Sequence, residues 1–192
     1  MTRLSDDFAS ESTRSFLERK LLETRTLLIY GRIDQSVAED VTQKLLLLSA
    51  TSNDPIKLFI NSQGGHVESG DTIFDMIRFV KPCVKIIGTG WVASAGALIY
   101  SSVPLEDRYS LPNTRYMLHQ PLGGVSGQAS DIAIEALEIV KMRERLNKSF
   151  AQQTGQPLEK ITKDTDRNFW MSAEEAKEYK LVGHIIHSID AI

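Results

Sequence analysis

Short apolar runs alternate along the chain with longer segments in which apolar residues recur every three or four positions. The apolar runs predict buried strands, and the three-to-four spacing predicts amphipathic helices. Strands are expected at 26–30, 56–60, 84–88 and 116–118, with Gly31 ending the first of them. Strands that alternate with helices favour an α/β domain built on a largely parallel sheet.

Two helices are predicted between the first three strands. The first begins after Asp34, whose side chain suits a helix N-cap, and its apolar positions fall on one face. The second ends before Pro82, because the residue before a proline is pushed away from helical geometry. Their apolar faces consist of Val37, Val41, Leu45 and Leu48, and of Ile73, Met76, Ile77 and Val80.

The second half of the chain is predicted to be mostly helical. One long helix runs from Ser130 to about Gln153, a short one lies near 158–161, and Ser172 is placed to cap the last. The long helix exceeds what a crossover between strands requires, so we expect it to project and meet a partner.

Composition limits the function classes. The 192 residues include 22 basic and 25 acidic side chains, a balance that gives no argument for nucleic acid or an anionic membrane as partner. The single cysteine, Cys83, excludes an internal disulfide framework and a cysteine-based zinc cluster, and is expected to be a small buried hydrophobe. No stretch approaches the roughly 20 apolar residues of a membrane span, and the N-terminus lacks a secretory apolar region, so a soluble cytoplasmic protein is expected. Residues 1–14 are polar and are predicted to form a flexible arm before a single domain at 15–192.

Three places along the chain have residue types suited to catalysis. Ser94 follows a strand at a predicted helix start, where free N–H groups would stabilise an oxyanion; in Ala-Ser-Ala-Gly it would equally serve close helix packing. Gly64 and Gly65 would let the backbone approach a ligand, or would simply make a tight strand-to-helix turn. His119 ends an apolar strand and opens a Gly/Pro-rich loop, as a general base often does; the alternative is a hydrogen-bonded structural histidine.

The remaining histidines are His66, His184 and His187, and none has a comparable setting. No cysteine or carboxylate cluster lies near them in the sequence, so no metal site is predicted.

Five segments together resemble the proteolytic subunit of the Clp proteases, and their order and spacing match from about Leu27 to Ile189. The most specific is the run from His119 to Gly124. The segments are Asn61-Ser62-Gln63-Gly64-Gly65, Ala93-Ser94-Ala95-Gly96, Met117-Leu118-His119-Gln120-Pro121-Leu122-Gly123-Gly124, Asp164-Thr165-Asp166-Arg167 and Met171-Ser172-Ala173-Glu174-Glu175-Ala176.

The resemblance implies a crotonase-like fold, a superhelical head of ββα units with a long protruding helix, the handle, in a region of about 120–155. Heptameric rings, of one kind of subunit or of two, would stack to a tetradecamer, with the handle between rings and residues 123–128 lining a substrate groove. An AAA+ unfoldase, which uses the ATP, would deliver unfolded polypeptide through a pore gated by arms such as 1–14, and the chain itself would need no cofactor. Phe59, Phe79 and Tyr109 match the family's apolar dock for the unfoldase, and Asp166 and Arg167 match the pair that links ring contacts to the active state.

The implied chemistry is acyl transfer by a serine endopeptidase. Ser94 would attack the peptide carbonyl, and His119 would remove its proton and later protonate the leaving amine. The N–H groups of Gly65 and Ala95 would hold the oxyanion.

The sequence departs from the family at two positions. The third member of the triad is usually an aspartate, and here it is Asn168, whose oxygen can orient the imidazole but supplies no negative charge. In an unrelated serine protease the Asp-to-Asn change costs about 10⁴ in kcat. Gln63 replaces the usual proline and is expected to loosen the loop that carries Gly65.

We therefore predict a weak peptidase when the chain is alone, and a more active one in mixed assemblies with a full-triad paralogue. Two other functions are compatible with the sequence. A mainly structural or regulatory subunit is favoured by Asn168, although Ser94, His119 and Gly65 are intact. A crotonase-type acyl-CoA enzyme would share the fold and the paired N–H groups, but it would not need Ser94 and His119 in this arrangement.

Overall fold

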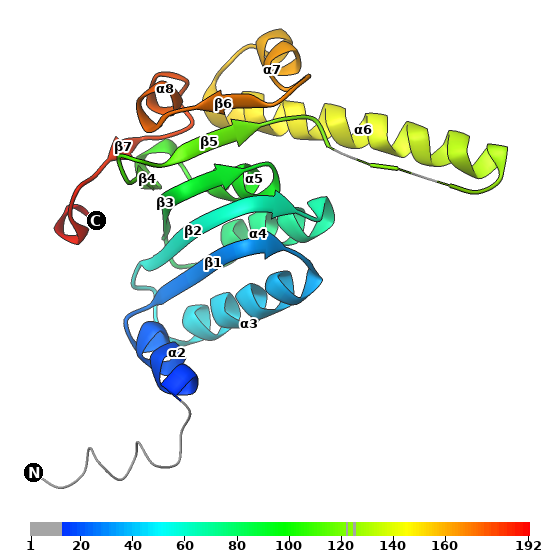
Figure 1. The fold of residues 1–192 in the computed structure, drawn as a ribbon. Helices are drawn as coiled ribbons and strands as arrows, with labels where there is room; N and C mark the ends of the chain where they lie inside the picture. Colours follow the sequence, from blue (N-terminus) through cyan, green and yellow to red (C-terminus); the bar gives the residue numbers. More distant parts are fainter. Residues whose placement is uncertain (1–12, 122, 125) are drawn as a thin grey trace, which may run out of the picture.

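The structure is a computed structural model that describes residues 13–121, 123–124 and 126–192 (Figure 1). Residues 1–12 of the predicted arm lie outside the described part, so the boundary between arm and domain remains a prediction. None of the helices described is long and apolar enough to cross a membrane.

One seven-stranded sheet forms the centre of the fold, and five of its strands follow the order β1-β2-β3-β4-β7. β5 pairs with β3 and, in the one antiparallel pairing of the described sheet, with β6. This confirms the predicted α/β class with a largely parallel sheet. The strands are β1 (Thr26–Ile33), β2 (Ile56–Gly65), β3 (Val84–Ala93), β4 (Arg108–Ser110), β5 (Arg115–Leu118), β6 (Phe169–Met171) and β7 (His184–Ile185).

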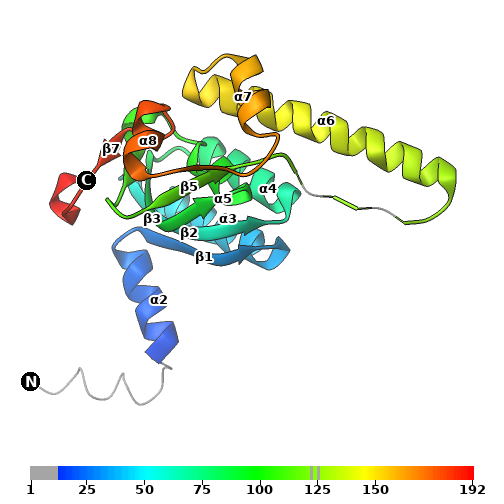
Figure 2. The ribbon, with the colours of Figure 1, turned by 45° about the horizontal axis from the view of Figure 1, so that its top comes forward.

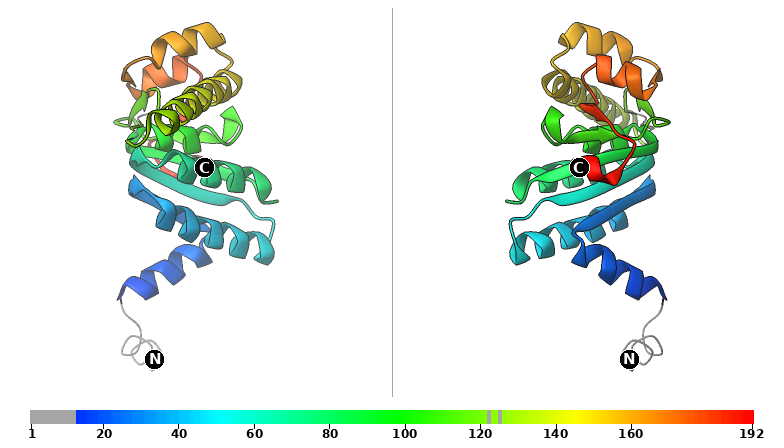
Figure 3. Two further views of the ribbon diagram at one scale, coloured as in Figure 1. Left: turned by 90° about the vertical axis from the view of Figure 1, so that its right-hand side faces the viewer. Right: turned by 90° about the vertical axis from the view of Figure 1, so that its left-hand side faces the viewer.

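The helices α3, α4 and α5 pack side by side along one face of the sheet (Figures 1 and 3). α2 and α6 extend from opposite ends of it (Figures 1 and 2). The α-helices are α2 (Thr13–Glu23), α3 (Gln35–Thr51), α4 (Val67–Phe79), α5 (Ala95–Tyr100), α6 (Ala129–Thr154), α7 (Leu158–Asp164) and α8 (Ala173–Glu178), with short 3₁₀ turns at Leu105–Asp107 and Ile189–Ala191.

The predicted helix starts are confirmed by their caps. The Val37 N–H donates to the Asp34 carboxylate over 3.0 Å at the start of α3. Ser172 and Glu175 form a reciprocal capping box at the start of α8. On the apolar faces, Val41 and Leu45 of α3 and Ile73 of α4 are buried against the sheet, as their spacing predicted.

Three local predictions are wrong. β1 does not end at Gly31, because this glycine adopts a φ of 80° at an irregularity in the pairing and the strand continues to Ile33. The strand predicted at 56–60 does not end there, because β2 continues to Gly65 and Gly64 pairs with Arg32 of β1, so the two glycines lie in a strand and not in a turn. Cys83 is exposed, because it lies just before β3, where its thiol donates to Asp107 over 3.4 Å.

α6 is the predicted long helix, and only its C-terminal part packs into the head (Figure 1). Leu146 and Phe150 are buried there, whereas the apolar side chains nearer its N-terminus are exposed: Ile132, Ile134, Leu137 and Val140. Arg145 of α6 makes a two-pronged ion pair with Asp71 of α4, with N–O distances of 2.7 and 2.6 Å. This pair connects the projecting helix to the helix that follows the glycine-rich end of β2.

Candidate functional site

Ser94 lies on a sharp turn between the end of β3 and the start of α5. Its φ of 56° and ψ of −123° place a non-glycine residue in a sparsely populated region of backbone space. The backbone is held on both sides of this turn, because the Ser94 N–H donates to the Met117 carbonyl over 2.9 Å and its carbonyl accepts from Leu98 over 3.1 Å. A serine held this way presents its hydroxyl at the edge of the sheet, as a nucleophile requires.

The two glycines at the end of β2 are required by close approach. A Cβ on Gly64 would lie 2.6 Å from the Ser94 Cβ and 2.8 Å from the Ala93 carbonyl oxygen. A Cβ on Gly65 would collide with the carbonyl oxygen of Ile33 in β1. The pair therefore lets β2 run between β1 and the serine turn without a steric clash.

His119 and Asn168 meet because of the register between β5 and β6. Leu118 pairs with Phe169 in this antiparallel ladder. His119, which follows β5, and Asn168, which precedes β6, therefore lie side by side. The His119 Nδ1 and the Asn168 Oδ1 are 3.1 Å apart. The His119 Nε2 and the Ser94 Oγ are 2.7 Å apart.

These contacts define the protonation of the imidazole. The amide oxygen of Asn168 only accepts hydrogen bonds, so Nδ1 of His119 carries the proton and Nε2 is free to accept the Ser94 hydroxyl proton. Burial lowers the pKa of His119, and the hydrogen bond that its Nδ1–H donates to Asn168 opposes this in part. The ring is thus held neutral and correctly oriented to act as a base.

A cavity of about 280 Å³ opens in front of Ser94 and His119. Gly65 forms part of its wall, and Ala95, which follows Ser94, is the first residue of α5. The predicted oxyanion pair therefore flanks the nucleophile from two separate elements. The lining residues are Arg32, Gln63, Gly64, Gly65, Val67, Ser94, His119 and Pro121.

Gln63 is bound to its neighbours, contrary to the expectation that it loosens the loop. With its amide oriented so that oxygen faces a donor and nitrogen an acceptor, Nε2 donates to the Gly31 carbonyl over 3.2 Å and Oε1 accepts from the Arg32 N–H over 3.3 Å. This side chain therefore connects β2 to the irregular part of β1.

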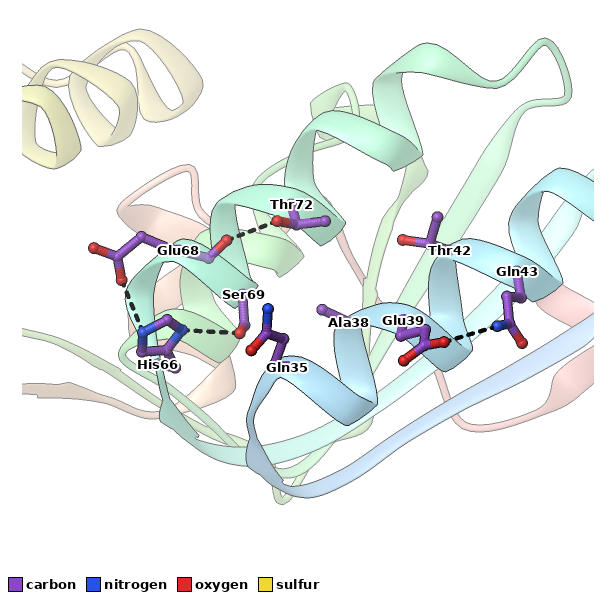
Figure 4. A pocket seen from close by; sticks show the side chains of 9 residues that line it. All are labelled: Gln35, Ala38, Glu39, Thr42, Gln43, His66, Glu68, Ser69 and Thr72. Carbon is purple, nitrogen blue, oxygen red and sulfur yellow. Dashed lines mark hydrogen bonds and ion pairs between the residues drawn. The ribbon is translucent and has the colours of Figure 1, made fainter.

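A larger cavity, of about 430 Å³, lies between the first turns of α3 and α4 (Figure 4). His66 lines it and contacts the Ser69 hydroxyl at 2.9 Å and the Glu68 carboxylate at 3.2 Å. Ser69 is only 3% exposed, so its hydroxyl is not presented to a substrate. Although Ser69 lies beside a histidine, the pair does not present a serine nucleophile to this cavity.

The three residues matched to an unfoldase dock do not all come together in the chain. Tyr109 packs with Ile87 and Ile186 in a small apolar cluster on the sheet, and Phe59 lies against it. Phe79, at the end of α4, is outside this cluster and 76% exposed.

Asp166 and Arg167 lie in the turn between α7 and β6, directly before Asn168. The Asp166 carboxylate pairs with Arg143 of α6 at 3.1 Å, and its carbonyl accepts from the Gln120 side chain over 2.7 Å. The acidic residue thus joins the loop after His119 to the long helix. Within the described residues, no group of three or more His, Cys, Asp or Glu side chains is arranged to hold a metal.

Sequence reasoning did not identify Arg32, Val67 or Pro121 as residues of the site. All three line the cavity in front of Ser94. For Arg32 the only available signal was its position after Gly31, and that glycine was interpreted as the end of a strand.

Comparison with known proteins adds sequence and structural relatives. The sequence profile described as Clp protease matches residues 10–189. The ATP-dependent Clp protease proteolytic subunit 2 of Gluconobacter oxydans is 59% identical over 189 residues, covering 97% of this chain and 85% of the relative. The subunit of the same name from Pseudomonas aeruginosa is 57% identical over 167 residues, covering 87% of this chain and 83% of the relative.

Solved structures of Clp-type subunits are similar to this chain in fold. ClpP1 from Listeria monocytogenes superimposes with a TM-score of 0.83 at 60% identity, covering 91% of this chain and 98% of that chain. An asparagine-to-aspartate mutant of that protein gives a TM-score of 0.85 with the same identity and coverage. The head with its long projecting helix is therefore confirmed as the Clp-type fold.

Proposed function

The chain belongs to the Clp protease family, and we propose that it is a serine endopeptidase subunit of an ATP-dependent protease, with Ser94 as nucleophile. The observation that carries the proposal is the continuous contact chain from Ser94 Oγ through His119 to Asn168, which faces an open cavity. Curated relatives that match nearly the full chain have names describing proteolytic subunits of this protease.

The proposed reaction is acyl transfer. The Ser94 Oγ attacks the carbonyl carbon of the scissile peptide while Nε2 of His119 takes the hydroxyl proton. The oxyanion that forms is stabilised by the N–H groups of Gly65 and Ala95. When the intermediate collapses, the C–N bond breaks and His119 gives its proton to the departing amine. Water then releases the acyl group by the same steps.

Asn168 sets the expected rate. Its oxygen orients the ring, but a neutral amide does not stabilise the imidazolium that forms when His119 takes the proton. We therefore propose weak activity for the chain alone and greater activity in mixed rings with a paralogue that has a full triad. The same residue favours the alternative of a mainly structural or regulatory subunit, in which the chain contributes ring surface but little chemistry.

The assembly is also a proposal. The exposed apolar residues Ile134, Leu137 and Val140 make α6 suited to burial against another subunit, as a handle between stacked heptameric rings requires. Asp166, which is ion-paired to Arg143 of α6, and Arg167 are proposed to connect such contacts to the site. Phe59, Phe79 and Tyr109 are proposed to receive an AAA+ unfoldase, with Phe79 offering its exposed ring from the end of α4.

Hydrolysis of a fluorogenic short peptide by purified protein tests the proposal. Wild type, Ser94→Ala and His119→Ala are compared, with the particle size of each sample measured. Slow cleavage that both substitutions abolish, at unchanged particle size, supports the serine mechanism. Equal cleavage by Ser94→Ala would overturn it.

Mixed assemblies separate the two roles. The chain is combined with a full-triad paralogue subunit, as wild type or as Ser94→Ala. If the Ser94→Ala assembly is slower than the wild-type assembly, this chain contributes catalysis. Equal rates would favour the structural subunit.

A further inference from the structure

The catalytic cavity contains a positive charge that the proposed acyl transfer does not use. Arg32 at the end of β1 is exposed and lines the cavity with Ser94 and His119. Over the described residues, its guanidinium has no ion pair or hydrogen bond. Most other arginines of the head are engaged, as Arg25 is with backbone carbonyls and Arg108 with the ends of two helices.

No negative charge balances this cation within the cavity. The described lining residues include no aspartate or glutamate, and the imidazole of His119 is held neutral by burial, which lowers its pKa. The other lining residues are uncharged: Gln63, Gly64, Gly65, Val67, Ser94 and Pro121. The cavity therefore has a net positive character beside the nucleophile.

The position of Arg32 is fixed by its surroundings. Its backbone pairs with Gly64, which in turn approaches the Ser94 turn. The side chain of Gln63 accepts from the Arg32 N–H and donates to the Gly31 carbonyl, so it holds the irregular part of β1 against β2. The backbone of Arg32, from which its side chain extends, is thereby held beside the cavity.

We propose that Arg32 determines specificity by binding a substrate carboxylate close to the scissile bond. This inference rests on the proposed peptidase function and adds the substrate class. A guanidinium is always charged, and its planar fork matches both oxygens of a carboxylate. An unpaired guanidinium beside a bound peptide is therefore suited to bind an acidic group of that peptide. The carboxylate belongs either to an Asp or Glu side chain or to the free C-terminus of a short peptide.

Binding to catalytically inactive protein tests this without any turnover. Ser94→Ala protein is titrated with acetylated and amidated peptides that differ only in Glu or Gln, with the position of that residue moved one step at a time. A third peptide has Gln at the varied position, no Asp or Glu, and a free C-terminal carboxylate in place of the amide. The same titrations use Ser94→Ala combined with Arg32→Gln, with Arg32→Lys or with Lys163→Gln, which removes an exposed cation of α7 that does not line the cavity.

We expect one of the carboxylate peptides to bind about tenfold more tightly than its neutral counterpart, a ratio equivalent to about 1.4 kcal/mol. Arg32→Gln brings this ratio close to one, Arg32→Lys retains part of it, and Lys163→Gln leaves it unchanged. A gain from Glu assigns the site to internal acidic residues, and a gain from the free terminus assigns it to chain ends.

Equal binding of each charged and neutral pair would overturn the proposal, as would a ratio that persists in Arg32→Gln. The peptidase assay of wild type against Ser94→Ala is read separately. If wild type shows no Ser94-dependent cleavage but the binding ratio depends on Arg32, the proposed function alone is rejected. If wild type shows Ser94-dependent cleavage but no such binding ratio, the role of Arg32 alone is rejected.

Discussion

The side-chain oxygen of Asn168 lies 3.1 Å from Nδ1 of His119, on the side of the ring opposite Ser94. This contact fixes the tautomer in which Nε2 can accept a proton. It provides orientation without charge, because an amide cannot balance the positive imidazolium that forms during attack. The proposed triad thus has its contacts in place but lacks a negative charge at its third member.

Asn168→Asp is expected to raise kcat for peptide cleavage by between about 10-fold and 10⁴-fold. The upper value is the cost of the reverse change in another serine protease. The carboxylate would occupy the position of the amide oxygen, so no rearrangement is required. Steady-state kinetics at fixed particle size measure the gain.

Asn168→Ala is the matched control for orientation. It removes the contact to Nδ1, and we expect its activity to fall below that of wild type. If Asn168→Asp gave no gain at unchanged size while Asn168→Ala was as active as wild type, Asn168 would have no role in the reaction.

The pH dependence of kcat/KM gives an independent reading of His119. The neutral ring is the active form, and burial lowers its pKa, so activity is lost only as the pH falls below the ordinary histidine value of about 6.5. In Asn168→Asp the added negative charge favours the imidazolium and raises the pKa, which moves this acid limb to higher pH. A limb at the same pH in both proteins would contradict the assignment of His119 as base.

Gly64→Ala tests the close approach of β2 to the nucleophile turn. The new methyl group would lie 2.6 Å from the Ser94 Cβ, and Gly64 has a φ of 95°, so the turn must shift. We expect a loss of at least about tenfold in kcat and a destabilisation of about 1–3 kcal/mol. Gly124→Ala is the stability control, since its methyl group meets nothing within 4 Å, and it should change the free energy of unfolding by less than about 0.5 kcal/mol.

Local chemistry predicted several elements correctly. Asp34 and Ser172 were identified as caps because short polar side chains satisfy the first N–H groups of a helix wherever the helix lies. The long helix ending at Thr154 was predicted from its spacing of apolar residues. By contrast, β4, β6 and β7 are too short to show a period, and their pairing depends on residues far away in the chain.

The site was less accessible to sequence reasoning. Ser94, His119 and Asn168 were connected through a family resemblance, because the β5–β6 register that joins His119 to Asn168 is a tertiary feature. Arg32 was missed for a similar reason, since its place in the cavity wall arises from the pairing of β1 with Gly64. Residue type alone showed only an arginine after a glycine.

Arg108 is expected to be essential for stability, because it is a buried guanidinium that is satisfied by backbone carbonyls at the ends of two helices. It is 1% exposed and donates to Val103 and Ser101 after α5, at 2.7 and 3.0 Å, and to Gln153 of α6 at 2.9 Å. Burial lowers its pKa to about 10, so it remains charged at neutral pH. Its positive charge interacts favourably with the negative C-terminal ends of both helices. Arg108→Met would leave these carbonyls unpaired, and we expect a loss of about 3 kcal/mol or more in the free energy of unfolding by denaturant at fixed protein concentration. Arg108→Lys should lose somewhat less, since it keeps the charge without the fork, and an Arg108→Met protein as stable as wild type would show that the two helix ends do not depend on this residue.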